Sequence, residues 1–167
     1  LDFEAARRGD PDARSATTDV RRLLAELKQE NVDGVVMDLR DNGGGSLIEA
    51  VELTGLFIEQ GPVVQVRETS GDVQVESDTD SSLAWNGPLA VLVNRSSASA
   101  SEIFAAAIQD YGRGLIIGEP TFGKGTVQTL IDLDKFPRRK DVQFGQLKMT
   151  IAQFFRIDGG TTQNAAV

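Results

Sequence analysis

The segment from Leu89 to Leu133 alternates short apolar runs with polar turns, and this pattern most restricts the possible fold. Residues 89–93 and 114–118 are apolar runs bounded by turn residues, which is typical of strands buried in a parallel sheet. An alanine-rich stretch over residues 100–111 predicts a helix, and residues 126–133 predict a further strand. Strands and helices that alternate through short connections predict an α/β fold.

The chain before this segment shows the same alternation. Apolar residues at helical spacing predict a helix that Thr17 or Thr18 caps and that ends before Gly34. Residues 35–39 (VVMDL) predict a buried strand, and a glycine-rich turn after them opens onto a helix predicted over residues 46–60.

Three further elements are predicted outside this alternation. Residues 62–68 and 73–76 alternate apolar and polar side chains around a Ser-Gly-Asp turn, which indicates a β-hairpin. Residues 134–141 are charged and contain proline, so they predict an exposed insertion. The alternating residues 144–157 predict a long strand or the arm of a hairpin.

Length and composition indicate one globular domain. The chain has 167 residues, of which 40% are hydrophobic and 25% charged. Residues 1–15 read as a linker and residues 16–167 as the domain. The net charge of −8 and the lack of a long basic block predict no nucleic-acid partner and no binding to anionic lipid. Because the chain begins at Leu1 and not at Met, we expect it to be part of a longer protein.

The chain contains no histidine and no cysteine. Nucleophilic chemistry would therefore run without an imidazole base or a thiolate, and a lysine amine is the strong base that burial can tune to neutrality. A metal site is not expected either, because carboxylates would be the available ligands, and no cofactor is expected. Ser plus Lys is thus the pair to examine, and Ser99 and Lys124 both lie in turns that follow predicted buried strands.

The predicted turns have properties that favour a site. A serine at the start of a helix lies where negative charge is stabilised, and the N–H of Ala100 could donate to an oxyanion formed there. The three glycines at 43–45 are more than a simple turn needs, so they suit the close approach of a backbone or a substrate. We expect Ser99 to lie at a helix start close to this glycine loop, and we expect the flexible loop around Lys124 to hold its amine beyond hydrogen-bond reach of Ser99.

The segment from Gly118 to Gly125 (GEPTFGKG) has a competing interpretation as a phosphate-binding loop. Gly125 stands where that motif needs Ser or Thr, Pro120 removes an amide, and a strand follows where a helix is needed. The nucleotide interpretation is therefore disfavoured. Asp110 can be explained structurally as a charge near a helix end. Glu102 can be explained as a carboxylate in the first turn of a helix, where negative charge is favoured.

The chain resembles the tail-specific or C-terminal processing peptidases, a family of serine–lysine peptidases. The segments DLRDNGGGSLIEAVELTGLFI, SASASEIFAAAIQDYGRG and GEPTFGKGTVQ carry the resemblance in order and spacing, and KMTIAQFFRIDGGTTQ adds a weaker fourth. The resemblance implies stacked ββα units of the ClpP/crotonase type, as a single peptidase core without the PDZ domain that family members usually carry. It also implies an endopeptidase that selects proteins by their C-termini, located in the bacterial periplasm or cell envelope, with any adaptor partner unknown.

The resemblance also assigns roles to residues. Ser99 matches the nucleophile and Lys124 the general base. Asp110 matches a residue assigned as a third charge-relay member, and Gln128 matches a glutamine thought to orient the lysine.

Oxyanion-hole donors are implied at Ala100 and in the glycine loop, with Gly44 or Gly45 preferred. Two alternatives remain open, a non-proteolytic binding module of the same fold and a crotonase-like acyl-CoA enzyme.

Overall fold

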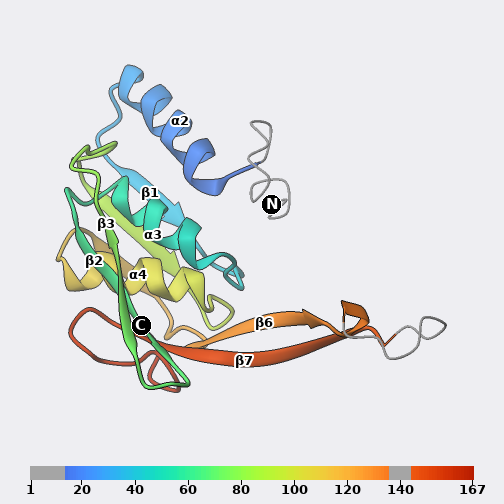
Figure 1. Cartoon of the computed structure of the whole chain (residues 1–167). Helices are drawn as coiled ribbons and strands as arrows, with labels where there is room; N and C mark the ends of the chain where they lie inside the picture. The colour runs from blue at the N-terminus through green and yellow to red at the C-terminus, as the bar shows by residue number, and fades with distance from the viewer. Residues whose placement is uncertain (1–13, 136–143) are drawn as a thin grey trace.

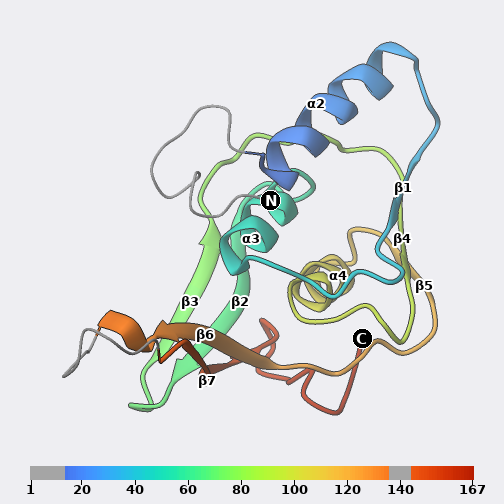
Figure 2. The same ribbon diagram turned by 90° about the vertical axis from the view of Figure 1, so that its right-hand side faces the viewer.

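The computed structural model describes residues 14–135 and 144–167, and it places two helices between two sheets. Figure 1 shows the whole chain, and in Figure 2 helices α3 and α4 lie between the strands β1, β4 and β5 on one side and β2 and β3 on the other. The predicted α/β class is confirmed, and the described residues form a single small domain.

The first sheet is parallel and has the strand order β1-β4-β5. Its strands are β1 (Val35–Asp38), β4 (Leu89–Val93) and β5 (Leu115–Gly118). The apolar runs predicted as buried parallel strands therefore pair as expected, with Val35 opposite Leu89.

The second sheet is antiparallel and has the order β3-β2-β7-β6. Strands β2 (Gly61–Glu68) and β3 (Val73–Asp78) form the predicted hairpin. Strands β6 (Thr126–Asp132) and β7 (Gln146–Phe155) form a longer one, which extends from the body of the molecule in Figure 1. A 3-10 turn, η1 (Leu133–Lys135), follows β6, and most of the predicted insertion lies outside the described residues.

The helices are α2 (Ala16–Gln29), α3 (Leu47–Gly55) and α4 (Ala100–Asp110). The predicted cap of α2 is wrong, because Ser15 caps this helix. Thr17 is buried and its hydroxyl donates to the Glu49 carboxylate at 3.0 Å, so it joins α2 to α3.

The predicted end of α3 is also wrong, since the helix stops five residues before Gln60. Beyond Gly55 the chain makes a tight turn, in which the amide of Phe57 donates to the carbonyl of Thr54 at 2.9 Å. Leu56 and Phe57 point into the core from this turn and are fully buried. Apolar spacing alone does not distinguish such a buried turn from another turn of helix.

Two hydrophobic clusters fill the space on either side of the helices. The cluster against the parallel sheet contains Leu24, Leu39, Leu56, Phe57, Trp85, Leu89, Val91, Val93, Phe104, Ala105 and Ile108. The cluster against the antiparallel sheet contains Ala50, Val51, Ile58, Val63, Val64, Val66, Ile103, Ala107, Ala152 and Phe154. Helix α4 contributes to both, so its alanines allow close packing on two sides. Among the described residues, no helix is both long and apolar enough to cross a bilayer.

Candidate active site

Ser99 is the N-cap residue of α4, in a sharp turn that follows β4. Its backbone angles, φ 59° and ψ −115°, lie in a region that a non-glycine residue rarely adopts. Such strain persists where the surrounding structure enforces it and is concentrated at functional sites. Some hydrolases present a nucleophilic serine on a strained strand-to-helix turn of this kind.

Neighbouring serines hold this turn against the loop that follows β1. The hydroxyl of Ser97 donates to the carbonyl of Leu39 at 2.7 Å, and the hydroxyl of Ser101 donates to the carbonyl of Asn42 at 3.1 Å. The amide of Ala98 also donates to the Asn42 carbonyl, at 3.0 Å. Ser97 and Ser101 thus have structural roles in this turn.

The glycine loop contacts the start of α4, as expected from the sequence. Gly44 has a φ of +88°, and a Cβ added there would lie 2.4 Å from the carbonyl oxygen of Ala98. The amide of Gly44 donates to the side-chain oxygen of Asn42 at 2.9 Å. Among the described residues, the amides of Gly45 and Ala100 have no hydrogen-bond acceptor, so they are the better candidates for oxyanion donors.

The amine of Lys124 lies 3.4 Å from the hydroxyl of Ser99, a long hydrogen bond. The expectation that this loop would hold Lys124 out of reach is therefore wrong. The loop is fixed from two sides, because the amides of Gly123 and Lys124 donate to Glu102, at 2.7 and 3.0 Å, and the amide of Gly125 donates to Gln163 at 2.8 Å.

Glu102 contacts both halves of the site, although its sequence position indicated only a first-turn carboxylate. Its side chain is completely buried in the first turn of α4. One carboxylate oxygen accepts from the amides of Ser99 (2.7 Å) and Lys124. The other accepts from the Thr121 hydroxyl (2.7 Å) and the Gly123 amide. Ser-x-x-Glu at a helix start is the common capping box, so the sequence signal pointed only to a local role.

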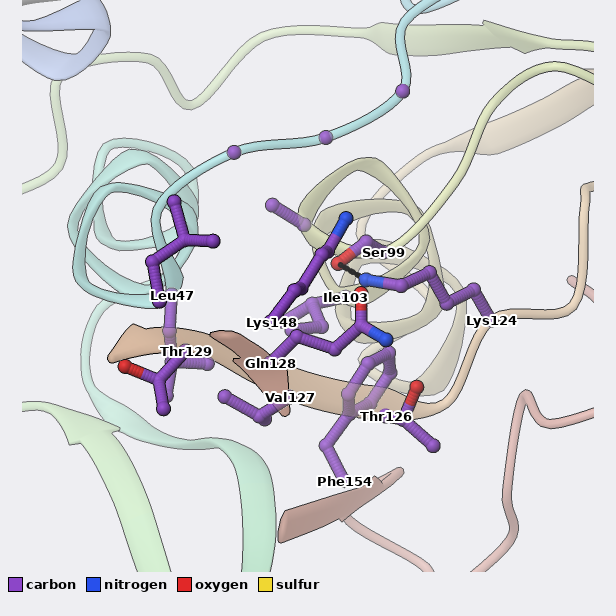
Figure 3. A pocket seen from close by; sticks show the side chains of 15 residues that line it. Leu47, Ser99, Ile103, Lys124, Thr126, Val127, Gln128, Thr129, Lys148 and Phe154 are labelled. Atoms are coloured by element: carbon purple, nitrogen blue, oxygen red, sulfur yellow. Dashed lines mark hydrogen bonds between the residues drawn. The ribbon is translucent and has the colours of Figure 1, made fainter. Parts of the chain in front are cut away.

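Ser99 and Lys124 line a pocket of about 500 Å³, shown in Figure 3. Its other lining residues come from the glycine loop, α3, α4, β6 and β7: Gly43, Gly44, Gly45, Leu47, Ala100, Ile103, Thr126, Val127, Gln128, Thr129, Leu130, Lys148 and Phe154. Gln128 donates to the Thr150 hydroxyl at 3.4 Å, and its side chain points toward the Ser99–Lys124 pair in Figure 3. The structure thus brings together every predicted site residue except Asp110.

Asp110 lies at the far end of α4 and does not line the pocket. The helix has 11 residues, which at about 1.5 Å per residue places Asp110 roughly 16 Å from its start. The carboxylate forms a salt bridge with Arg156, and the two side chains are only 10% and 19% exposed. The hydrogen bond with Asp110 raises the pKa of Arg156. This geometry favours a structural role for Asp110.

Lys148 of β7 is a second lysine in the pocket that the sequence reasoning did not single out. The alternation of the strand puts it on the same face as Thr150, which is the signal that could have found it.

Charged groups also flank the start of the glycine loop. Arg40 donates to Asp38 at 2.7 Å, and this side-chain hydrogen bond lowers the pKa of the carboxyl to about 2. Across the described residues, no group of three metal-ligating side chains is close enough to hold an ion.

Residues 3–167 match the sequence profile described as peptidase family S41. The chain belongs to peptidase family S41. This S41 domain is 51% identical over 153 residues to a tail-specific protease of Haemophilus influenzae, a match covering 88% of this chain and 21% of the relative. It is 41% identical over 120 residues to the chloroplastic carboxyl-terminal-processing peptidase 2 of Arabidopsis thaliana, covering 71% of this chain and 23% of the relative.

The S41 domain also has the fold of solved relatives. It matches the photosystem II D1 C-terminal processing protease with a TM-score of 0.77 and 34% identity, over 90% of this chain and 37% of that one. The chain spans about a fifth of the length of the two curated relatives it matches. The resemblance to tail-specific or C-terminal processing peptidases that the sequence motifs indicated is therefore confirmed.

Proposed function

We propose that this domain is the catalytic core of a serine endopeptidase in which Ser99 attacks a peptide carbonyl and Lys124 acts as general base. The observation that carries the proposal is the contact of 3.4 Å between the two side chains, both of which line the pocket. S41 membership supports a peptidase, since the relatives it matches are named as processing proteases.

The proposed reaction begins when Lys124 Nζ takes the proton of the Ser99 hydroxyl as its oxygen forms a bond to the carbonyl carbon. The negative charge that develops on the carbonyl oxygen is stabilised by the Gly45 and Ala100 amides and by the start of α4. The lysine then gives the proton to the leaving amine, and the peptide C–N bond breaks. Water hydrolyses the acyl-enzyme with Lys124 again as base. Gln128 is proposed to orient the lysine.

The substrate class is proposed to be proteins selected by their C-termini, as in the relatives named for tail-specific and carboxyl-terminal processing. Strand β6 is an edge strand of the described sheet, and five of its residues line the pocket. An extended peptide can therefore add to this edge and pass the Ser99 hydroxyl. We place the activity in the bacterial periplasm or cell envelope, on the same family resemblance.

The two alternatives find less support. A binding module has no need of a serine and a lysine in contact. An acyl-CoA enzyme of the crotonase type would use acidic residues near the glycine loop, and none of the described residues lining the pocket carries a carboxylate.

Labelling the full chain with a fluorophosphonate and mapping the modified residue tests the nucleophile. We expect labelling at Ser99 and its loss in Ser99→Ala, with Ser96→Ala, an exposed serine three residues away, as the matched control. Lys124→Ala should abolish peptide cleavage while the thermal melt stays close to that of the wild type. Lys124→Arg should not restore it, because a guanidinium stays charged. Full activity in Lys124→Ala would overturn the proposed mechanism.

A further inference from the structure

Lys148 faces the same pocket as Ser99 and Lys124 but has no part in the proposed hydrolysis. It lies on β7 opposite Leu130 of β6 and lines the pocket. In Figure 3 its side chain extends from the strand toward the side on which Ser99 lies. A second lysine amine therefore faces the space that a substrate would fill.

The charges around this space are of one sign. Of the described residues that line the pocket, Lys124 and Lys148 are the two with ionisable side chains, and none of these residues is acidic. Within residues 14–135 and 144–167, Lys148 has no hydrogen-bond or salt-bridge partner, whereas the chain as a whole carries a net charge of −8. A cationic cleft in an otherwise acidic protein attracts anions locally.

We infer that Lys148 forms a subsite for a carboxylate of the peptide substrate, which makes it a specificity-determining residue. The inference rests on the proposed peptidase function, because the peptide must lie in this pocket. The ligand chemistry is a carboxylate, supplied by an Asp or Glu side chain or by the free C-terminus of the peptide.

The register of the sheet places this subsite near the scissile bond. Residues 126–130 of β6 line the pocket in succession, and Lys148 stands opposite the last of them. An extended peptide advances about 3.3 Å per residue, so the Lys148 amine can reach groups a few residues from the bond that Ser99 attacks. Lys148 itself is exposed, and solvent screening therefore limits the effect to about three- to tenfold in kcat/KM.

Matched peptides test this subsite in the full chain. One series carries a single Glu or Gln at successive positions across the scissile bond, and a second carries a free or an amidated C-terminus. We expect the wild type to favour the acid over its neutral partner, at one position or at the C-terminus, by about three- to tenfold at low salt. Lys148→Met should abolish this preference for the acid, and Lys148→Glu should reverse it, so that the neutral peptide is favoured. A preference seen in the Glu/Gln series would identify an acidic side chain as the source of the carboxylate. A preference for the free over the amidated C-terminus would identify the terminal carboxylate.

Lys28→Glu is the control for Lys148→Glu. It makes the same charge change on the exposed face of α2, away from the pocket. It should leave both the ratio and the basal activity unchanged. An unchanged ratio in Lys148→Met, or an equal loss for acidic and neutral peptides, would overturn the inference.

A binding measurement separates this inference from the proposed mechanism. Fluorescence anisotropy with the Ser99→Ala variant reports peptide affinity without turnover, and the acid-to-neutral ratio of Kd should again depend on Lys148. If the wild type cleaved no peptide while this ratio held, the peptidase proposal would fail and the carboxylate subsite would stand. If the wild type cleaved peptides and Lys148→Met left the ratio of Kd intact, only the subsite would fail.

Discussion

The Glu102 carboxylate accepts hydrogen bonds from both segments that carry the site. The amide of Ser99 donates to it from the start of α4, and the amides of Gly123 and Lys124 donate from the loop. A buried carboxylate is costly unless hydrogen bonds satisfy it, and here four donors do so. We therefore assign Glu102 to holding Ser99 and Lys124 at their mutual distance.

Glu102→Gln should lower both stability and activity. The amide side chain has one oxygen and one NH₂ group, so an N–H donor of the site then faces another donor. Since hydrogen bonds to charged groups contribute about 1.5–3 kcal/mol, we expect a loss of about 2–4 kcal/mol in the free energy of unfolding. Denaturant titration measures it, and Glu59→Gln, on an exposed carboxylate, is the control. An unchanged kcat per folded molecule would contradict the positioning role.

Asp110→Asn should lower stability without changing turnover per folded molecule. The variant leaves the largely buried Arg156 without a charged partner, which costs about 2–4 kcal/mol in such a pair. Thermal melts measure the stability, and active-site titration corrects kcat for the folded fraction. A large fall in corrected kcat with an unchanged melt would show instead that Asp110 acts in the charge relay.

At the scale of elements, the site is made where three strand ends and one helix start meet. The loop after β1 and the turn after β4 lie together because these strands are parallel neighbours. The loop after β5 joins them and brings Lys124 to the same edge. The antiparallel hairpin of β6 and β7 then forms the opposite wall of the pocket.

Gly44→Ala should disrupt the contact between the glycine loop and α4. The added Cβ would lie 2.4 Å from the Ala98 carbonyl oxygen and 2.7 Å from the Ala100 nitrogen, at a φ of +88°. We expect a loss of about 1–3 kcal/mol and a fall in kcat, because the oxyanion donors are displaced. Gly43→Ala is the matched control, since a Cβ there meets nothing within 4 Å. Equal kcat in the two variants would refute the assignment of this loop to the site.

At the scale of the whole molecule, a single arginine joins the end of α4 to two separate segments. Arg113 donates to the carbonyls of Phe57 at 2.7 Å, Trp85 at 2.8 Å and Gly87 at 2.9 Å. Burial lowers the pKa of this guanidinium, yet the carbonyls satisfy its N–H groups. The end of α4 is therefore fixed to the turn after α3 and to the segment before β4 by polar contacts as well as by the hydrophobic clusters.

Arg113→Met should destabilise the domain by about 2–4 kcal/mol, because three carbonyls lose a charged donor. Peptide cleavage at low temperature should persist, since Arg113 lies outside the pocket. Calorimetry measures the change in Tm. Arg95→Met provides the comparison, because Arg95 is 81% exposed and its salt bridge to Glu119 spans 3.9 Å, so a change within about 0.5 kcal/mol is expected. Similar losses in both variants would disprove the connecting role.

The amino-acid sequence by itself was sufficient to predict the parallel strands, the start of α4 and the position of the glycine loop near Ser99. These features depend on short-range patterns, namely apolar runs, turn residues and the spacing of motifs. Only the tertiary structure decided that Glu102 unites the two halves of the site, that Asp110 pairs with Arg156, and that Lys148 faces the pocket. Each of these contacts joins elements whose separation in the chain says nothing of their distance in space. A carboxylate or a lysine that looks like an ordinary surface charge in the sequence acquires its role from the partners that folding brings to it.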